Sequence, residues 1–389
     1  MTILGKVILK KGKEYSIERF HPWIFSGAIQ SVDGNASDGD WVEVLDSAKR
    51  EIGYGHYQKG TITVRVLSFQ GRPDENFYNE KIKQAFHQRV VSKVVSDSTN
   101  CYRLVHGEGD GLPGLIIDVY NGAAIMQSHS SGMHKDRKLI AKALKFVLTG
   151  LNSIYYKSQN TLSEKTQNEY LLGMGVLPHV ALEHGNRFYV DWEDGQKTGF
   201  FLDQRENRRL LGEMSKGAKV LNTFCYTGGF SIYALNGGAD LVHSVDASEK
   251  AIAMTRKNLE LNKYDPATHA CFTMDTFDFL KDKQDQYDMI ILDPPAFAKH
   301  KDARHQAMKG YQRLNAEAIR IVKPNGIIFT FSCSQVVDRQ LFYDTIVSAA
   351  IQTGREVKVL HHLSQPADHP VSMYHPEGEY LKGLVLFVK

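Results

Sequence analysis

The chain has 389 residues, of which 42% are hydrophobic and 23% are charged, and its formal net charge is +3. This composition excludes a largely disordered protein, and the length, at roughly 100–200 residues per domain, predicts two or three domains. The small charge excludes a protein that coats nucleic acid through charge alone, and no apolar run approaches the roughly 18 residues that a membrane-spanning helix needs. We therefore expect a globular protein with no membrane partner.

Four cysteines lie too far apart in the sequence to form a CxxC metal or redox pair: Cys101, Cys225, Cys271 and Cys333. We therefore expect neither a metal site nor a disulfide framework. The first residues lack the continuous apolar segment and the cleavage site of a signal peptide. The expected location is the reducing cytoplasm.

Residues 1–70 read as short strands broken by Gly and Asp. The stretches 7–9, 41–45 and 61–67 are rich in β-branched and aromatic residues, and the glycines of 53–55 indicate a turn. This region therefore predicts a small β-barrel or sandwich.

Residues 75–190 mix helical and strand patterns. Apolar residues spaced for one helical face run from Phe77 to Val90 and from Ile140 to Leu151. Strands are predicted at 102–105, 115–119 and 123–126. We expect an α+β middle domain.

Residues 191–389 alternate between strands and helices, and the strands are predicted at 219–222, 241–245, 270–274, 288–292 and 326–331. The fourth strand is apolar on consecutive residues, as a strand covered on both faces should be. Such repeated units predict a right-handed, mostly parallel, doubly wound α/β sheet, Rossmann-like in class. Two final strands, 356–360 and 383–388, are close enough to pair antiparallel at one edge of the sheet.

Ligands of such a sheet bind at the carboxyl ends of its strands. A turn with two glycines, residues 224–230, follows the first strand, but it is neither GxGxxG nor a P-loop. Asp246 is positioned for ribose hydroxyls and Asp275 for an adenine amine, although either carboxylate alone is more often a helix cap. A site without a phosphate cradle favours S-adenosylmethionine. The residues expected to line it here are Asn222, Phe224, Tyr226, Thr227, Gly228, Asp246, Asp275 and Asp293.

The segment 198–204 precedes the first strand of this sheet. It has two interpretations, a plain helix start or an edge of the cofactor site. In the second, Phe200 or Phe201 packs on the cofactor and Gln204 hydrogen-bonds to it.

The fourth strand ends in Asp293, followed by two prolines, and the fifth ends beside Cys333. A thiol and a carboxylate next to a methyl donor suit methylation of pyrimidine C5, because a thiolate that adds at C6 makes C5 nucleophilic. Asp293 would hydrogen-bond the amine and N3 of cytosine. The base that removes the C5 proton is assigned first to Glu377, with Asp368 and His369 as substitutes.

The chain resembles the large-subunit (23S) ribosomal RNA cytosine-C5 methyltransferase I family over essentially its whole length. The segments that carry the resemblance are 21–27, 102–114, 198–205, 293–297, 331–334 and 380–383. The resemblance implies a PUA-like RNA-binding domain at 1–70, a middle domain at 75–190 and a class I methyltransferase domain at 191–389. It further implies Cys333 as the nucleophile, Asp293 as the base-contacting acid, S-adenosylmethionine as the cofactor and ribosomal RNA as the partner.

A target cytosine inside folded RNA must be flipped out or already unpaired to reach such a pocket. Three alternatives stay open: guanine-N methylation of ribosomal RNA, a non-catalytic RNA-binding assembly factor, and a nicotinamide oxidoreductase, which the missing GxGxxG disfavours. A homodimer is compatible with the sequence, which does not identify the modified nucleotide.

Overall fold

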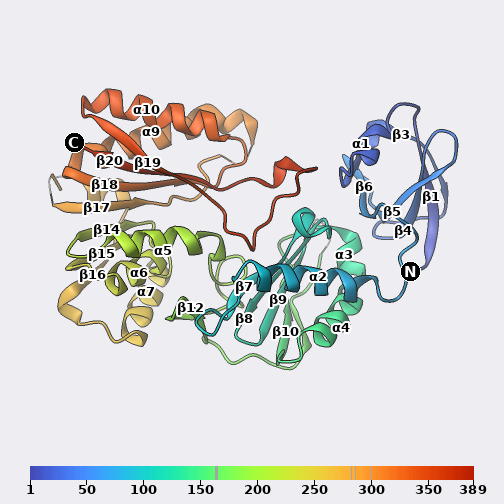
Figure 1. The fold of residues 1–389 in the computed structure, drawn as a ribbon, viewed down its shortest axis with the longest axis horizontal. Coiled ribbons are helices and arrows are strands. Elements are labelled where there is room, and N and C mark those ends of the chain that lie inside the picture. The colour runs from blue at the N-terminus through green and yellow to red at the C-terminus, as the bar shows by residue number, and fades with distance from the viewer. Residues whose placement is uncertain (163–164, 282, 285, 299) are drawn as a thin grey trace. The chain divides into compact units, whose positions relative to one another are not determined.

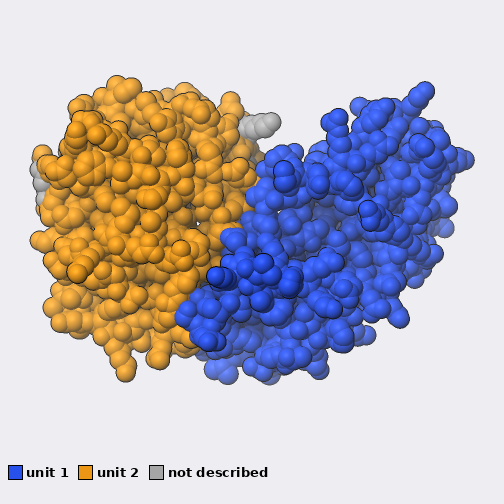
Figure 2. All heavy atoms as spheres, viewed as in Figure 1, with its two compact units in different colours: residues 1–179, 190–200, 367–378 blue, residues 180–189, 201–366, 379–389 orange. Residues whose placement is uncertain are grey.

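The computed structural model describes residues 1–162, 165–281, 283–284, 286–298 and 300–389. The chain forms two compact units (Figure 2), each made of three separate segments. Unit 1 contains 1–179, 190–200 and 367–378, and unit 2 contains 180–189, 201–366 and 379–389. Within these described residues, no helix is both long and apolar enough to cross a bilayer.

The N-terminal part of unit 1 is a six-stranded sheet in the order β2-β6-β5-β4-β1-β3 (Figure 1). Its elements are β1 (Ile3–Leu9), α1 (Tyr15–Glu18), β2 (Trp23–Phe25), η1 (Ser26–Ala28), β3 (Ile29–Gly34), β4 (Trp41–Leu45), β5 (Glu51–Tyr57) and β6 (Ile62–Ser68). Valines of β1, β4 and β6 are buried together in one apolar cluster. The predicted strands of this region are confirmed, because β-branched residues fill one face of the sheet.

The turn predicted at 53–55 is wrong, since these residues lie inside β5. A Cβ on Gly55 would come 2.1 Å from the Arg65 carbonyl oxygen on the neighbouring β6. The glycine therefore marks a close approach of two strand backbones and not a reversal of the chain.

The second part of unit 1 is a five-stranded sheet in the order β11-β10-β9-β8-β7. Its elements are α2 (Phe77–Val91), β7 (Cys101–His106), η2 (Gly107–Asp110), β8 (Leu115–Tyr120), β9 (Ala123–Ser128), α3 (Ser131–Lys135), α4 (Arg137–Val147), β10 (Ser153–Tyr156) and β11 (Glu169–Leu172). The first predicted helix is confirmed, but the second ends at Val147 and does not reach Leu151. Leu151 nonetheless packs against the same core, which explains the longer apolar pattern.

Asp136 joins the two parts of unit 1. Its Oδ2 accepts hydrogen bonds from Trp41 Nε1 at 2.8 Å and from the Tyr78 hydroxyl at 2.5 Å, and it lies 3.1 Å from His56 Nε2. Trp41 and His56 come from the six-stranded sheet, so one buried carboxylate connects both parts. The division into domains at residues 70 and 190 stays a prediction.

Unit 2 is built on a seven-stranded sheet in the order β16-β15-β14-β17-β18-β20-β19. Its strands are β14 (Lys219–Thr223), β15 (Leu241–Asp246), β16 (His269–Thr273), β17 (Tyr287–Leu292), β18 (Val322–Ser332), β19 (Val357–Ser364) and β20 (Lys382–Val388). The strands from β14 to β18 pair in parallel, and β20 pairs antiparallel with both β18 and β19. This is the predicted doubly wound sheet with the predicted antiparallel pair at its edge.

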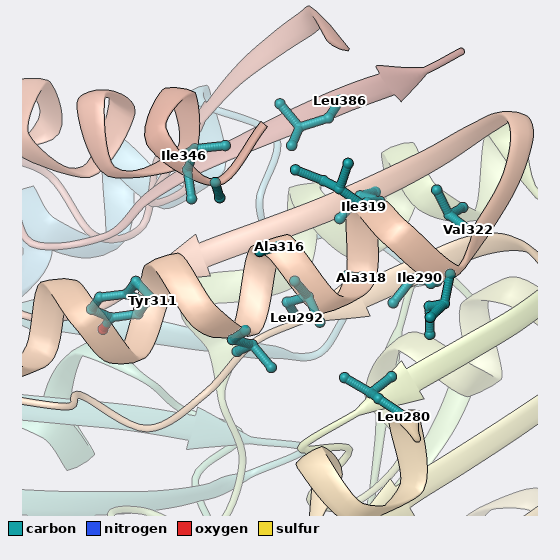
Figure 3. Packing of buried hydrophobic residues seen from close by; sticks show 14 of the residues in the cluster. Leu280, Ile290, Leu292, Tyr311, Ala316, Ala318, Ile319, Val322, Ile346 and Leu386 are labelled. Carbon is teal, nitrogen blue, oxygen red and sulfur yellow. The ribbon is translucent and has the colours of Figure 1, made fainter. Parts of the chain in front are cut away.

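Helices separate the strands of unit 2, and their burial follows the sequence periodicity. They are η3 (Leu202–Gln204), α5 (Arg205–Met214), α6 (Gly229–Asn236), α7 (Glu249–Leu261), η4 (Pro266–Thr268), α8 (Thr276–Leu280), η5 (Lys301–Ala303), α9 (Arg304–Ile321), α10 (Arg339–Thr353) and η6 (Pro376–Gly378), of which η6 belongs to unit 1. On α9, Tyr311, Leu314, Ala318 and Ile321 are completely buried at helical spacing. Tyr311 and Ala318 are labelled in Figure 3 among the residues of this core cluster. A hairpin of β12 (His179–Glu183) and β13 (Asn186–Val190) completes the fold.

Candidate functional site

The order of the strands in unit 2 fixes where a ligand binds. Connections leave β14 towards β15 on one side, while β17 lies on its other side. At such a switch point the loops at the carboxyl ends of the strands diverge and leave a crevice. The candidate site therefore lies at the ends of β14, β15, β17 and β18.

The turn between β14 and α6 has a left-handed backbone. The φ angle is 53° at Phe224, 48° at Tyr226 and 79° at Gly228. A Cβ on Gly228 would lie 2.7 Å from Cγ2 of Thr255, so the turn has no room for a side chain there. Glycine therefore lets the turn pack closely on α7 with a positive φ at this position, and contact of the turn with a cofactor stays a prediction.

Gly228→Ala is expected to lower the affinity for S-adenosylmethionine at least about tenfold, because the new Cβ is strained at this φ and displaces the turn. Isothermal titration calorimetry measures the affinity. Gly217→Ala is the matched control, since Gly217 has a φ of 72° and nothing within 4 Å of its ideal Cβ. An equal loss of affinity in both variants would contradict a specific role for the Gly228 turn.

Asp246, at the end of β15, connects that strand to the glycine turn. Its Oδ2 accepts a hydrogen bond from the Tyr226 N–H at 2.9 Å, and its Oδ1 accepts one from the Ser248 N–H at 2.9 Å. The cap of α7 is Ser248, which accepts from the Ala251 N–H. Asp246 is therefore not the helix cap, and its carboxylate is held at the crevice.

Asp275 is the N-cap of α8, which confirms the second of its two interpretations, that of a helix cap. Its Oδ1 accepts hydrogen bonds from the N–H groups of Phe277 at 2.8 Å and Asp278 at 3.2 Å, at the start of α8. The carboxylate is exposed. Its contact with an adenine amine stays a prediction.

Gln204 contacts the carboxylate that follows β17. Its Nε2 donates to Asp293 Oδ1 at 3.1 Å, while its Oε1 accepts from Asn207 Nδ2 at 2.6 Å. Gln204 and Asn207 are both only 3% exposed. This buried chain of hydrogen bonds orients Asp293, and the segment around it does begin a helix, since η3 leads into α5.

The two neighbouring phenylalanines belong to different units. Phe201, in unit 2, places its ring edge-on to Tyr226 with centroids 5.0 Å apart. Phe200, in unit 1, is 4% exposed, and its carbonyl accepts a hydrogen bond from the Tyr120 hydroxyl at 3.4 Å. Contact of either ring with a cofactor stays a prediction.

Asn222 and Thr227 are buried around the glycine turn. Asn222 Nδ2 donates to Ser231 Oγ at 2.9 Å, and the Thr227 carbonyl accepts from Asn258 Nδ2 at 2.8 Å. These bonds hold the turn in shape, while direct cofactor contacts of the two residues stay a prediction.

Cys333 follows β18 directly and is partly exposed. Beside it lies Lys382 at the start of β20, whose Nζ donates to the carbonyls of Ser334 and Val337, both at 2.6 Å. Burial lowers the pKa of Lys382 to about 8, and the neighbouring charge of Cys333 opposes this shift. The segment 380–383 carries the resemblance, but the sequence assigned Lys382 no role, because the strand pairing of β18 and β20 alone brings it to the thiol.

Cys333 and Asp293 both lie close enough to Tyr311 to affect its pKa. Burial raises the pKa of Tyr311 to about 12, and the negative charges of Cys333 and Asp293 both act in the same direction. The two strands that carry these groups are paired in parallel, with Leu292 opposite Thr330. The predicted adjacency of the fourth and fifth strands is confirmed.

The three base candidates lie in the unit 1 segment 367–378. Asp368 is buried, and its Oδ2 accepts a hydrogen bond from the Arg103 N–H at 3.0 Å. His369 Nδ1 lies 3.1 Å from Asp368 Oδ1. Glu377 lies 3.9 Å from His21 and 3.8 Å from His375. Proton removal by Glu377, Asp368 or His369 stays a prediction.

Two family models match the chain. The model described as S-adenosylmethionine-dependent methyltransferase covers residues 152–381, and the model described as PUA-like domain covers residues 7–69. The first includes the glycine turn, Asp293 and Cys333. The cofactor of this chain is therefore S-adenosylmethionine.

Relatives match over the full length of the chain. Ribosomal RNA large subunit methyltransferase I of Aeromonas hydrophila is 38% identical over 394 residues, which cover 98% of this chain and 99% of the relative. A solved S-adenosylmethionine-dependent methyltransferase from Streptococcus mutans is 25% identical with a TM-score of 0.84, and a methyltransferase solved in complex with SAH is 25% identical with a TM-score of 0.85. Both matches cover 100% of this chain and 100% of the solved chain. The chain therefore belongs to the ribosomal RNA large subunit methyltransferase I family and is an S-adenosylmethionine-dependent methyltransferase.

Proposed function

We propose that this enzyme methylates C5 of a cytosine in large-subunit ribosomal RNA, with Cys333 as the covalent nucleophile. The observation that carries the proposal is the placement of a partly exposed thiol and an oriented carboxylate after two paired parallel strands. Methylation at a ring or exocyclic nitrogen needs no thiol, so Cys333 favours carbon as the acceptor.

S-adenosylmethionine, which would bind at the turn that contains Gly228, supplies an electrophilic methyl carbon. The Cys333 thiolate adds to C6 of the cytosine, and the ring electrons move to C5. C5 then forms a bond to the methyl carbon while the sulfonium–methyl bond breaks, and S-adenosylhomocysteine leaves. A base then takes the C5 proton, the C6–S bond breaks and the thiolate is regenerated. Each bond that Cys333 forms is broken again, so the enzyme turns over.

Asp293 recognises the base in this proposal. One carboxyl oxygen accepts from the exocyclic amine of cytosine, and a proton shared between the other oxygen and ring N3 stabilises the negative charge that develops on the ring in the adduct. Gln204 Nε2 donates a hydrogen bond to Oδ1 of Asp293 and so fixes one carboxylate oxygen. Because Asn207 in turn fixes Gln204, the carboxylate is oriented before the substrate arrives.

The substrate class follows from the relatives and from the N-terminal domain. The relatives are named for the large ribosomal subunit, and a PUA-like domain matches residues 7–69. The target cytosine is flipped out or unpaired, since a base inside a helix cannot reach a crevice at the end of a sheet.

Mass mapping of modified nucleotides tests the proposal directly. Unmodified large-subunit ribosomal RNA is incubated with the protein and labelled cofactor, then digested and analysed. A single 5-methylcytidine is the expected product. Methylguanosine would favour guanine-N methylation, and cofactor binding without any RNA product would favour an assembly factor.

Lys382→Met is expected to slow methyl transfer about tenfold at pH 7 and to move the acidic limb of the pH–rate profile to higher pH. The ammonium favours the nearby thiolate, so a higher pH is needed to form the thiolate without it. Lys382 is charged below its pKa of about 8 and neutral above it, so the difference between the variant and the wild type should shrink above pH 8. Single-turnover rates across pH measure this effect, and Lys382→Arg should retain most of the low-pH rate.

A further inference from the structure

Three side chains of unit 1 converge from two segments that lie far apart in the sequence. His21 precedes β2, while His375 and Glu377 lie in the 367–378 segment. One ligand atom from each, two imidazole nitrogens and one carboxylate oxygen, all lie within 4.8 Å of one another. We name His21, His375 and Glu377 the histidine–glutamate cluster.

His375 is a buried imidazole within this cluster. His375 is only 3% exposed. Within the described part of the chain, neither of its ring nitrogens has a hydrogen-bond partner. A buried imidazole nitrogen without a hydrogen-bond partner is costly, and coordination of a metal ion would satisfy it.

The spacing of the cluster differs from that of an ordinary hydrogen-bonded pair. Glu377 lies 3.9 Å from His21 Nε2 and 3.8 Å from His375 Nε2. A hydrogen bond requires about 2.7–3.2 Å, whereas two ligands of one tetrahedral ion at about 2.0–2.2 Å lie roughly 3.4 Å apart. The two distances, which run to different carboxylate oxygens, are too long for hydrogen bonds. All three ligand atoms lie within 4.8 Å of one another, so the side chains must draw closer to surround an ion.

His21 lies against the backbone of Trp23. The Trp23 N–H donates to His21 Nδ1 at 3.2 Å, and the Trp23 carbonyl oxygen lies 3.3 Å from the same nitrogen. A metal ion at Nε2 requires the tautomer in which Nδ1 carries the proton, and that proton can then be donated to the Trp23 carbonyl in place of the bond from the N–H. Trp23 also packs edge-on against His375 with ring centroids 4.3 Å apart, and its Nε1 donates to Glu108 at 2.9 Å.

We propose that the histidine–glutamate cluster binds one divalent transition-metal ion, such as Zn²⁺, and thereby fastens the 367–378 segment to the N-terminal domain. Two imidazoles and one carboxylate suit Zn²⁺, Co²⁺ or Ni²⁺, whereas Mg²⁺ prefers oxygen ligands alone. Three protein ligands leave one position for water. A Glu377 that binds the metal ion cannot serve as the base, so this proposal leaves proton removal to Asp368 or His369. Metal titration needs no RNA or S-adenosylmethionine, so its outcome is separate from that of the methyl-transfer assays.

The test uses the full-length protein after removal of metal with a chelator. Co²⁺ is titrated while visible d–d absorption is recorded, and Zn²⁺ is titrated by calorimetry. Wild type is expected to bind one equivalent and to melt at a higher temperature with Zn²⁺ than without. His375→Ala and His21→Ala should each lose at least about 100-fold in affinity and the melting shift with it.

His87→Ala is the matched control, because His87 is an exposed histidine on α2 of the same unit. It should bind Zn²⁺ as the wild type does. If His375→Ala does not fold, Glu377→Gln and His21→Ala still test the site, since both positions are at least partly exposed. An absence of binding by the wild type, or unchanged stoichiometry and affinity in the cluster variants, would overturn the proposal.

Discussion

Cys333→Ala is expected to lower methyl transfer to ribosomal RNA by at least about 10⁴-fold, because the covalent route loses its nucleophile. Cys333→Ser should leave at most a trace, since an alcohol is far less acidic than a thiol and adds poorly to C6. Incorporation of labelled methyl groups into unmodified RNA measures the loss. Calorimetry should find the affinity for S-adenosylmethionine unchanged in both variants, which shows that the site is folded.

A trapping experiment distinguishes lost chemistry from lost RNA binding. RNA that contains 5-fluorocytidine offers no C5 proton, so elimination is blocked after methyl transfer and the enzyme stays bonded to C6. The wild type should form a complex that survives denaturing electrophoresis, and Cys333→Ala should not. Full turnover by the alanine variant would reject the covalent mechanism and favour methylation of a ring nitrogen.

Asp293→Asn is expected to lower kcat by about 10²–10³-fold with a smaller change in KM, because an amide cannot share a proton with ring N3 as negative charge develops in the adduct. The hydrogen bond from Gln204 survives in this variant, since the asparagine carbonyl still accepts it. Single-turnover kinetics with saturating RNA measures the effect.

Asp288→Asn is the matched control for this substitution. Asp288 lies near the start of β17, whereas Asp293 follows its end, and Asp288 accepts from Lys323 Nζ and from the Lys219 N–H. Its loss should alter stability slightly and leave kcat unchanged. An equal fall in kcat for both variants would mean that β17 is merely destabilised.

Local patterns predicted the sheet of unit 2 well. The run from Met289 to Leu292 is apolar on every residue and is buried on every residue, because a strand between two helical layers has no solvent face. The adjacency of β17 and β18 followed from the connection rules for parallel sheets. Topology alone therefore predicts that Asp293 and Cys333 follow the ends of neighbouring strands.

The side-chain partners of the site could not be predicted in the same way. Gln204 donates a hydrogen bond to Asp293, which is 89 residues away in the sequence. Lys382 donates one to the carbonyl of Ser334, which is 48 residues away. Neither pairing leaves a trace in periodicity, because both depend on how strands are ordered in space. The turn predicted at 53–55 is wrong for the same reason. Gly55 is needed because the backbone of Arg65, on another strand, lies too close for a side chain.

The position of β20 has a consequence for how the enzyme is made. This strand lies between β18 and β19, yet it follows both in the chain. During synthesis the sheet therefore stays open until residues 382–388 have left the ribosome and inserted between strands made earlier. Because Lys382 arrives with that strand, a prematurely terminated chain lacks both the closing strand and the ammonium beside Cys333, and an incomplete product is left without an assembled thiol site.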